Sequence, residues 1–121
     1  PLSGYTSLTY FNINTCLQIT DISPLAGNTG IQEIIMRSVP FGNAGMPTFA
    51  NMTALYRLNA RETGITDISV LVNLMQQGAL QDATPGAMEN GGGATLDLRQ
   101  NNVDCTLLDP YRANIANLDG C

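Results

Sequence analysis

The sequence contains no histidine and no lysine, so all five of its basic residues are arginine. Without lysine the chain cannot form a Walker-type phosphate loop or a Schiff base. Without histidine it lacks the side chain most often used as a general base, and it lacks imidazole ligands for a metal. No pair of nucleophile and base is recognisable among the remaining residues. We therefore expect a protein that is not an enzyme and that has no cofactor and no metal site.

Positive charge is also scarce. Five arginines face ten acidic residues, which gives a net charge of −5 and a pI near 4.2. Such a balance disfavours binding to nucleic acid or to an anionic membrane surface. Hydrophobic residues make up 44% of the chain, enough for a packed core. No apolar run approaches the roughly 20 residues needed to cross a bilayer, so we expect no membrane insertion.

The sequence is internally repetitive. The phrase Ile-Thr-Asp-Ile-Ser occurs at residues 19–23 and again at residues 65–69, and each copy is followed by a leucine two residues later. The two copies are 46 residues apart, which is two periods of 23. Residues 1–8 match residues 24–31 at the same period of 23. A fixed period in this range indicates stacked structural units rather than a single irregular globule.

Each unit, which we call a module, carries apolar residues in the pattern L-x-x-L-x-L. In the first module Phe11 and Ile13 alternate with the polar residue Asn12, as expected for a short strand with one buried face. The remaining modules follow the same spacing, with glycine in place of the first leucine in the last of them. The apolar positions are Leu8, Phe11, Ile13; Ile31, Ile34, Met36; Leu55, Leu58, Ala60; and Gly93, Leu96, Leu98.

Residues 55–71 and 96–103 resemble leucine-rich repeats, and the Ile-Thr-Asp-Ile-Ser-x-Leu ending is typical of the internalin-type, 22/23-residue repeats of bacterial surface or secreted proteins. This resemblance implies an α/β solenoid, a right-handed superhelix with a short parallel sheet on its concave face. The convex segments would be irregular or short helices. We expect about four repeats in residues 1–104, the first one truncated because Pro1 stands in mid-module, so that this piece would be a fragment with more chain before it.

Two regions depart from a regular repeat. Leu58 and Leu96 are 38 residues apart, and the excess is assigned to an insertion at residues 76–93, preceded by helical spacing in residues 70–77 and ending in glycine-rich loop composition. Residues 105–121 are expected to form a C-terminal helical cap with one apolar face. The turn position after each strand, where this family favours asparagine, holds Cys16, Val39, Thr63 and Asn101, so only the last turn matches.

The three cysteines give a limited indication of compartment. Cys105 and Cys121 would close a loop of about 16 residues as a disulfide, which favours an oxidising compartment. A secreted or cell-surface location is then expected, with a cytoplasmic protein bearing two reduced thiols as the alternative. Cys16 occupies an inward turn position and is expected to be a buried thiol.

In the implied fold, the residues between the buried positions of each strand point outward from the concave face. Arg37, Arg61 and Arg99 share one place in successive modules, and would form a row with neighbours about 4.8 Å apart. Either this row is a recognition surface for anionic groups of a partner, or it is a solvated charge network paired with nearby carboxylates. The candidate partner-binding residues are Tyr10, Asn12, Ile35, Arg37, Arg57, Asn59, Arg61, Asp97 and Arg99.

Two functions remain open on these observations. The chain could be a non-catalytic interaction module that binds a protein or glycan partner through its concave face. Alternatively, it could be a structural spacer or self-assembly unit of a larger surface protein, stacking on upstream repeats or on another copy through its open N-terminal end. The apolar residues Leu2, Leu8 and Phe11 near that end motivate the second hypothesis.

Overall fold

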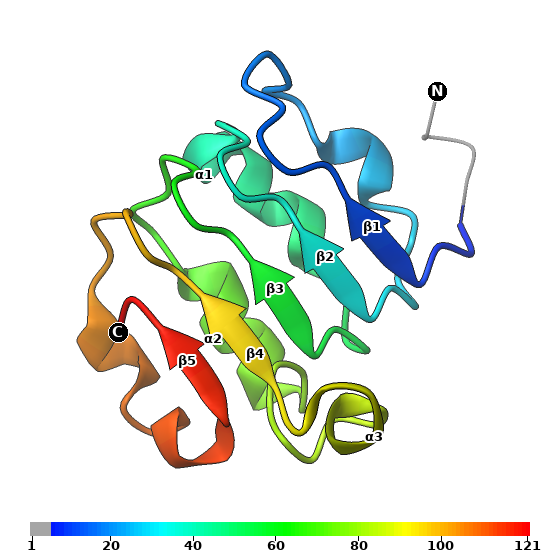
Figure 1. Ribbon diagram of the computed structural model, residues 1–121, viewed down its shortest axis with the longest axis vertical. Coiled ribbons are helices and arrows are strands. Elements are labelled where there is room, and N and C mark those ends of the chain that lie inside the picture. The colour runs from blue at the N-terminus through cyan, green and yellow to red at the C-terminus, as the bar shows by residue number, and fades with distance from the viewer. Residues whose placement is uncertain (1–5) are drawn as a thin grey trace.

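The computed structural model describes residues 6–121, and its strands form one parallel sheet in which they lie side by side in chain order (Figure 1). Each strand is three residues long and pairs with the next without any offset, so that one apolar residue stands at the centre of every strand. The strands are β1 (Tyr10–Asn12), β2 (Glu33–Ile35), β3 (Arg57–Asn59), β4 (Thr95–Asp97) and β5 (Asn117–Asp119).

Parallel strands need a crossover connection, and here the crossovers carry the helical segments. In Figure 1 helices α1 and α2 lie behind the sheet, which leaves the other face open to the viewer. We call this uncovered side the open face. The α-helices are α1 (Gly42–Gly45), α2 (Ser69–Gln76) and α3 (Ala87–Gly91), and the 3₁₀ helices are η1 (Ser23–Leu25), η2 (Met46–Phe49), η3 (Cys105–Leu108) and η4 (Arg112–Asn114). The arrangement is that of an α/β protein with a short parallel sheet.

The hydrophobic core lies between the sheet and the crossovers. The central strand residues Ile34, Leu58 and Leu96 are fully buried there. From the second crossover, Phe41 and Phe49 add an edge-to-face aromatic pair with ring centroids 5.7 Å apart, an arrangement that stabilises beyond simple area burial. The segment after β2 therefore supplies core residues.

The repeated Ile-Thr-Asp-Ile-Ser phrase forms the same hydrogen bond in both copies. The carboxylate Oδ1 of Asp21 accepts from the backbone N–H of Ser23, and Oδ1 of Asp67 accepts from that of Ser69, each at 2.9 Å. These bonds satisfy a backbone donor at the start of η1 and of α2. Hydrogen bonds from Ser23 lower the pKa of Asp21, and those from Ser69 lower the pKa of Asp67. The phrase therefore serves to begin a helical turn.

The insertion between β3 and β4 is held firmly in place. Helix α2 confirms the helix expected in residues 70–77. After it, Oδ1 of Asp82 accepts hydrogen bonds from the backbone N–H groups of Ala94 at 2.8 Å and Ala116 at 2.9 Å. Gly93 allows this approach, because a Cβ there would lie 2.6 Å from Oδ1 of Asp82 and 2.5 Å from Cβ of Ala116. Asp82 thus ties the insertion to the last strand.

The C-terminal segment differs from the expected helical cap. Residues 105–121 contain two short 3₁₀ helices and then strand β5. The backbone N–H of Asn117 donates to the carbonyl of Ala94, and the carbonyl of Asp119 accepts from the N–H of Leu98. A continuous helix would leave these groups at the edge of β4 without partners, and unpaired backbone groups are costly. The apolar spacing that suggested a helix instead buries Leu108 and Ile115.

The three cysteines form one disulfide and leave one free thiol. Cys105 and Cys121 form a disulfide with their Cα atoms 5.4 Å apart, which joins the start of the C-terminal segment to its last residue. Cys16 is free and only half-buried, so its thiol is less enclosed than the sequence suggests.

Candidate functional site on the open sheet face

Two rows of side chains cross the open face because the first and third residues of each strand point away from the core. The first row runs Tyr10, Glu33, Arg57, Thr95 and Asn117. The second row runs Asn12, Ile35, Asn59, Asp97 and Asp119. Six of the nine residues predicted to contact a partner belong to these two rows. The other three, Arg37, Arg61 and Arg99, follow the ends of β2, β3 and β4.

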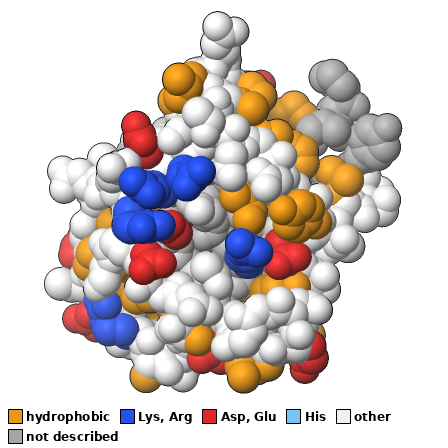
Figure 2. Space-filling model, viewed as in Figure 1, with side chains coloured by type: hydrophobic (Ala, Val, Ile, Leu, Met, Phe, Trp, Pro, Cys, Tyr) orange, Lys and Arg blue, Asp and Glu red, His pale blue; other side chains and the backbone are white. Residues whose placement is uncertain are grey.

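The strand ladder continues past the strands and aligns three arginines. The carbonyl of Arg37 accepts from the N–H of Thr15 at 2.6 Å, that of Arg61 from Ser38 at 2.9 Å and that of Arg99 from Glu62 at 2.9 Å. We call Arg37, Arg61 and Arg99 the arginine row. Arginine side chains gather in one group on the open face in Figure 2. The predicted alignment of these three residues is confirmed.

A residue in the left-handed region follows each member of this row, and another follows Asn14 at the equivalent place in the first module. These residues are Thr15, Ser38, Glu62 and Gln100, with φ values of 62°, 60°, 56° and 59°. Non-glycine residues occupy that region at a cost of roughly 1–2 kcal/mol each. Its recurrence at equivalent places shows that every module turns from strand to crossover with the same backbone geometry.

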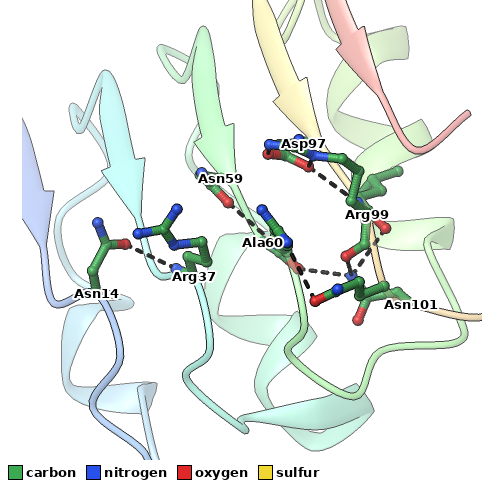
Figure 3. Close-up of polar contacts among 10 residues, drawn as sticks. Asn14, Arg37, Asn59, Ala60, Asp97, Arg99 and Asn101 are labelled. Atoms are coloured by element: carbon green, nitrogen blue, oxygen red, sulfur yellow. Dashed lines mark hydrogen bonds and ion pairs between the residues drawn. The ribbon is translucent and has the colours of Figure 1, made fainter.

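Polar residues of the second row hold these turns. Oδ1 of Asn12 accepts from the N–H of Asn14 at 3.2 Å, and Oδ1 of Asn59 accepts from the N–H of Arg61 at 3.1 Å. Ile35 cannot do the same for Arg37. In its place Oδ1 of Asn14, on the neighbouring module, accepts from the N–H of Arg37 at 3.1 Å (Figure 3). Asn12, Asn14 and Asn59 therefore position the arginine row.

Ile35 is not available to a partner. It was expected to be exposed, but only 6% of its surface is accessible. Its register neighbours Asn12 and Asn59 flank it on both sides within the sheet, and side chains opposite one another on adjacent strands cover each other. The expectation that Ile35 supplies exposed apolar contact is wrong.

Asp97 and Arg99 form an ion pair with each other. Asp97 is only 3% exposed, and its carboxylate accepts from Nε of Arg99 at 3.0 Å, Nη2 at 2.6 Å and the backbone N–H at 3.1 Å (Figure 3). Burial raises the pKa of Asp97, but the hydrogen bonds from Arg99 and the positive charges of Arg99 and Arg61 outweigh it and lower the pKa overall. The hydrogen bond to Asp97 also raises the pKa of Arg99. This is a bidentate, charge-assisted pair.

Two other predicted contact residues, Arg57 and Tyr10, remain exposed. Arg57 lies 3.7 Å from the carboxylate of Glu33 in a loose surface ion pair of a kind that contributes little energy. Tyr10 is 49% exposed, and its hydroxyl accepts a hydrogen bond from Nδ2 of Asn12. Both side chains could therefore be reached by a partner.

Arg37 and Arg61 carry the uncompensated charge of the row. Neither guanidinium group forms an ion pair with any carboxylate of residues 6–121. The side chain of Arg61 makes one long hydrogen bond of 3.4 Å to the neutral amide of Gln100. The nearby carboxylate of Glu62 accepts from Oγ of Ser38 at 3.2 Å. The charge network is thus self-paired at Arg99 but not at Arg37 and Arg61.

Asn101 links two turns through more bonds than the sequence suggests. Its Oδ1 accepts from the N–H groups of Thr63 at 3.1 Å and Gly64 at 3.2 Å, and its Nδ2 donates to the carbonyl of Ala60 at 2.8 Å (Figure 3). The amide also donates to the carbonyls of Leu98 and Arg99. Asn101 is the one turn residue that matches the family pattern, and that match is the signal for this role.

Asp82 and Asn14 were not singled out from the sequence. Both act through hydrogen bonds to backbone groups of other modules, more than ten residues away. No local motif marks such residues. Asn14 could have been found by noting that Ile35 lacks an oxygen for the turn that Asn12 and Asn59 hold in neighbouring modules.

In the part of the chain that the structure describes, no three acidic or cysteine residues come together in a way that could hold a metal ion. No helix within residues 6–121 has the length and apolar character needed to cross a membrane. Comparison with known proteins found no matching family model, no matching curated protein and no matching solved structure.

Proposed function

We propose that this chain is a leucine-rich-repeat module, in which the parallel sheet forms the concave side of a right-handed α/β solenoid. Support comes from the sequential order of the strands and from their unshifted register. The recurring left-handed residue after each arginine adds to it. Successive strands start at Tyr10, Glu33, Arg57, Thr95 and Asn117, in steps of 23, 24, 38 and 22 residues. Three of these four steps fit a repeat of 22–24 residues.

We infer that the module is a non-catalytic interaction domain that binds a protein or glycan partner through the open face. The observation that carries this inference is the arginine row. Two guanidinium groups without ion pairs stand side by side on a chain whose net charge is −5. Arginine binds carboxylates and similar planar anions in a bidentate manner. The partner would therefore present anionic groups to Arg37 and Arg61.

The predicted contact residues divide into two roles. Arg37, Arg61 and Tyr10 would contact the partner, with Arg57 at the margin of the surface. Asn12, Asn59 and the Asp97–Arg99 pair would hold the contact residues in place, because their side chains already bond within the chain. Tyrosine and arginine are residue types often found at the energetic centre of interfaces.

The open face sets the size of the interface. Five strands spaced about 4.8 Å apart give a sheet only about 20 Å wide. This area suits an anionic loop or a few sugar residues better than a large flat protein surface.

We also propose a secreted or cell-surface location, which the Cys105–Cys121 disulfide supports. Disulfides form and persist in oxidising compartments. The resemblance to repeats of bacterial surface proteins points to the same location.

The test uses two polyanions as probes, poly-glutamate for acidic peptides and heparin for sulfated glycans. Replacing Arg37→Glu together with Arg61→Glu should lower affinity for the bound probe by at least about tenfold, because each reversal replaces attraction with repulsion. Binding is measured by calorimetry at two salt concentrations, and folding by circular dichroism.

The matched control is Arg112→Glu with Asp109→Arg, which alters charge in the C-terminal segment and leaves the net charge unchanged. This control should bind the probe like the parent chain. If the parent binds neither polyanion, or if the double reversal binds as well as the control, the open face is not the anionic binding surface.

A further inference from the structure

Backbone groups at the outer edge of β1 have no hydrogen-bond partner within residues 6–121. The equivalent groups of every other strand are hydrogen-bonded to the preceding module. The first residues of β2, β3, β4 and β5 donate their N–H to a carbonyl of the preceding module. The equivalent donor on β1 is the N–H of Tyr10, and it has no acceptor among residues 6–121. Likewise, the carbonyls of Ile35 and Asn59 accept from the preceding module, whereas the equivalent carbonyl of Asn12 has no donor there.

An apolar cleft of about 280 Å³ lies beside this edge. It is almost wholly lined by apolar side chains of the first module, namely Phe11, Ile13, Ile19, Ile22, Pro24 and Leu25. A cleft of this kind next to an open strand edge is costly in water.

Comparing the exposure of equivalent residues in different modules indicates what kind of unit would fill the cleft. Ile19 and Ile65 hold the same place in the repeated phrase, but Ile19 is 38% exposed and Ile65 is 0% exposed. Phe11 is partly exposed, whereas its equivalent Ile34 is fully buried. Ile34 and Ile65 each have a preceding module packed on them, which the first module lacks within residues 6–121. The uncovered surface of the first module therefore corresponds to the surface on which a preceding module packs elsewhere in the sheet.

The opposite end of the sheet cannot supply that cover. Beyond β5, Leu108 and Ile115 are buried, and the Cys105–Cys121 disulfide fixes the segment that follows β4 against the last residues. The sulfur of Cys105 also lies 3.4 Å from the carbonyl of Gly120. Because these apolar side chains are already covered, this end offers little apolar surface to fill the cleft of a second copy, which makes a second copy a poor occupant.

We propose that the β1 edge and the adjoining cleft bind one further strand-and-turn unit of the same pattern, added in register as a sixth parallel strand. The unit carries apolar residues at the positions equivalent to Phe11 and Ile13, which enter the cleft. Its carbonyl accepts from the N–H of Tyr10, and its N–H groups donate to the carbonyls of Asn12 and Asn14. This surface is separate from the arginine row and does not depend on an anionic partner.

The test places a second copy of residues 1–23 directly ahead of the intact 121-residue chain, which keeps the 23-residue period because residues 1–8 match residues 24–31. Hydrogen exchange is measured at the original Tyr10 and Asn12 amides. Exchange should slow at least about a hundredfold, as expected when edge amides become part of a stable ladder. The control carries Phe11→Asp and Ile13→Asp in the added copy only, and should leave exchange at the parent rate.

Two further measurements test the proposal independently of the extended chain. A peptide of residues 8–23 with Cys16→Ser is added to the intact chain, and should shift the amide signals of Tyr10 and Asn12 even if the extended chain misfolds. Sedimentation of the intact chain should show a monomer. Unchanged exchange together with no peptide binding overturns the proposal. So does a dimer in which both amides are already protected, because a second copy then occupies the edge.

Discussion

Asp97 is the residue at which burial, charge and hydrogen bonding compete most directly. The sequence places it on the open face, yet only 3% of it is exposed and all its strong contacts are to Arg99. The net effect is a lowered pKa. A carboxyl whose pKa is lowered by folding stabilises the protein above its unfolded pKa of about 3.9, and that contribution is lost as the pH falls through the folded pKa.

Replacing Asp97→Asn should therefore destabilise the chain by about 1–2 kcal/mol at pH 7, because it keeps an oxygen for the N–H of Arg99 but loses the charged pair. As the pH falls below the unfolded pKa of about 3.9 and through the lower folded pKa, the parent progressively loses this contribution, so the difference between the two should shrink. Urea unfolding at several pH values measures both effects. Asp119→Asn, at an exposed position in the same row, serves as the control. An equal loss of stability at pH 3 and pH 7 would contradict the assigned role.

The arginine row shows how far residue-level reading of the sequence reaches. The alignment of Arg37, Arg61 and Arg99 could be predicted because strand alternation and a constant period fix it. Pairing of the row with nearby carboxylates is one of the two alternatives that the sequence allows, and it holds at Asp97. The burial of Ile35 and Asp97 could not be predicted, because it depends on what neighbouring strands place beside them. Strand alternation predicts which way a side chain points, but it does not predict whether neighbouring residues bury that side chain or pair with it.

At the scale of elements, the turns after the strands matter more than the strands themselves. Each strand has only three residues, whereas Asn101 alone makes hydrogen bonds to the turns of two modules. Such an amide fixes the spacing of adjacent crossovers. The modules before it use other means, such as Asn14, and Oγ1 of Thr63 donating to the carbonyl of Ala60.

Replacing Asn101→Ala should lower the free energy of unfolding by about 2–3 kcal/mol, since it leaves several backbone groups in the half-buried turn without partners. Asn101→Asp should recover part of the loss, because it keeps the acceptor for Thr63 and Gly64 but not the donors. The control is Asn102→Ala at the exposed neighbouring position. Chemical denaturation followed by circular dichroism measures all three. Equal stabilities of the two alanine variants would rule out the linking role.

Strand β5 shows why the sequence does not predict every element of the sheet. Asn117, Leu118 and Asp119 carry no strand signal of their own, and the apolar spacing of residues 107–118 favours a helix. The edge of β4 decides the outcome, because its unpaired backbone groups are satisfied only by a strand. By contrast, the apolar spacing of residues 70–77 correctly predicted α2. Local patterns identify an element where no neighbouring strand competes for the segment, and tertiary pairing decides where a strand edge leaves backbone groups without partners.

At the scale of the whole molecule, the two ends of the sheet are built differently. The β1 end exposes an apolar cleft, whereas the β5 end is closed by the C-terminal segment and its disulfide. Because stability in a row of modules is transmitted between neighbours, closing one end also protects the modules behind it.

Replacing both Cys105→Ser and Cys121→Ser should lower the free energy of unfolding by about 3 kcal/mol, the loop-entropy value for a closed loop of this length. The protection of the β4 and β5 amides should fall more than that of β2. Guanidinium unfolding and hydrogen exchange measure these effects. Cys16→Ser is the control and should change stability little, since Cys16 is free. A uniform loss of protection along the sheet would show that the disulfide does not act as a local clamp.

The long connection between β3 and β4 has a consequence for tolerance to change. Arg57 and Thr95 are 38 residues apart, yet they pair in the same register as residues 23 or 24 apart. The length of a crossover is therefore decoupled from the geometry of the open face. Sequence can be gained or lost behind the sheet while the open face stays unaltered, so the crossovers and the open face can diversify independently.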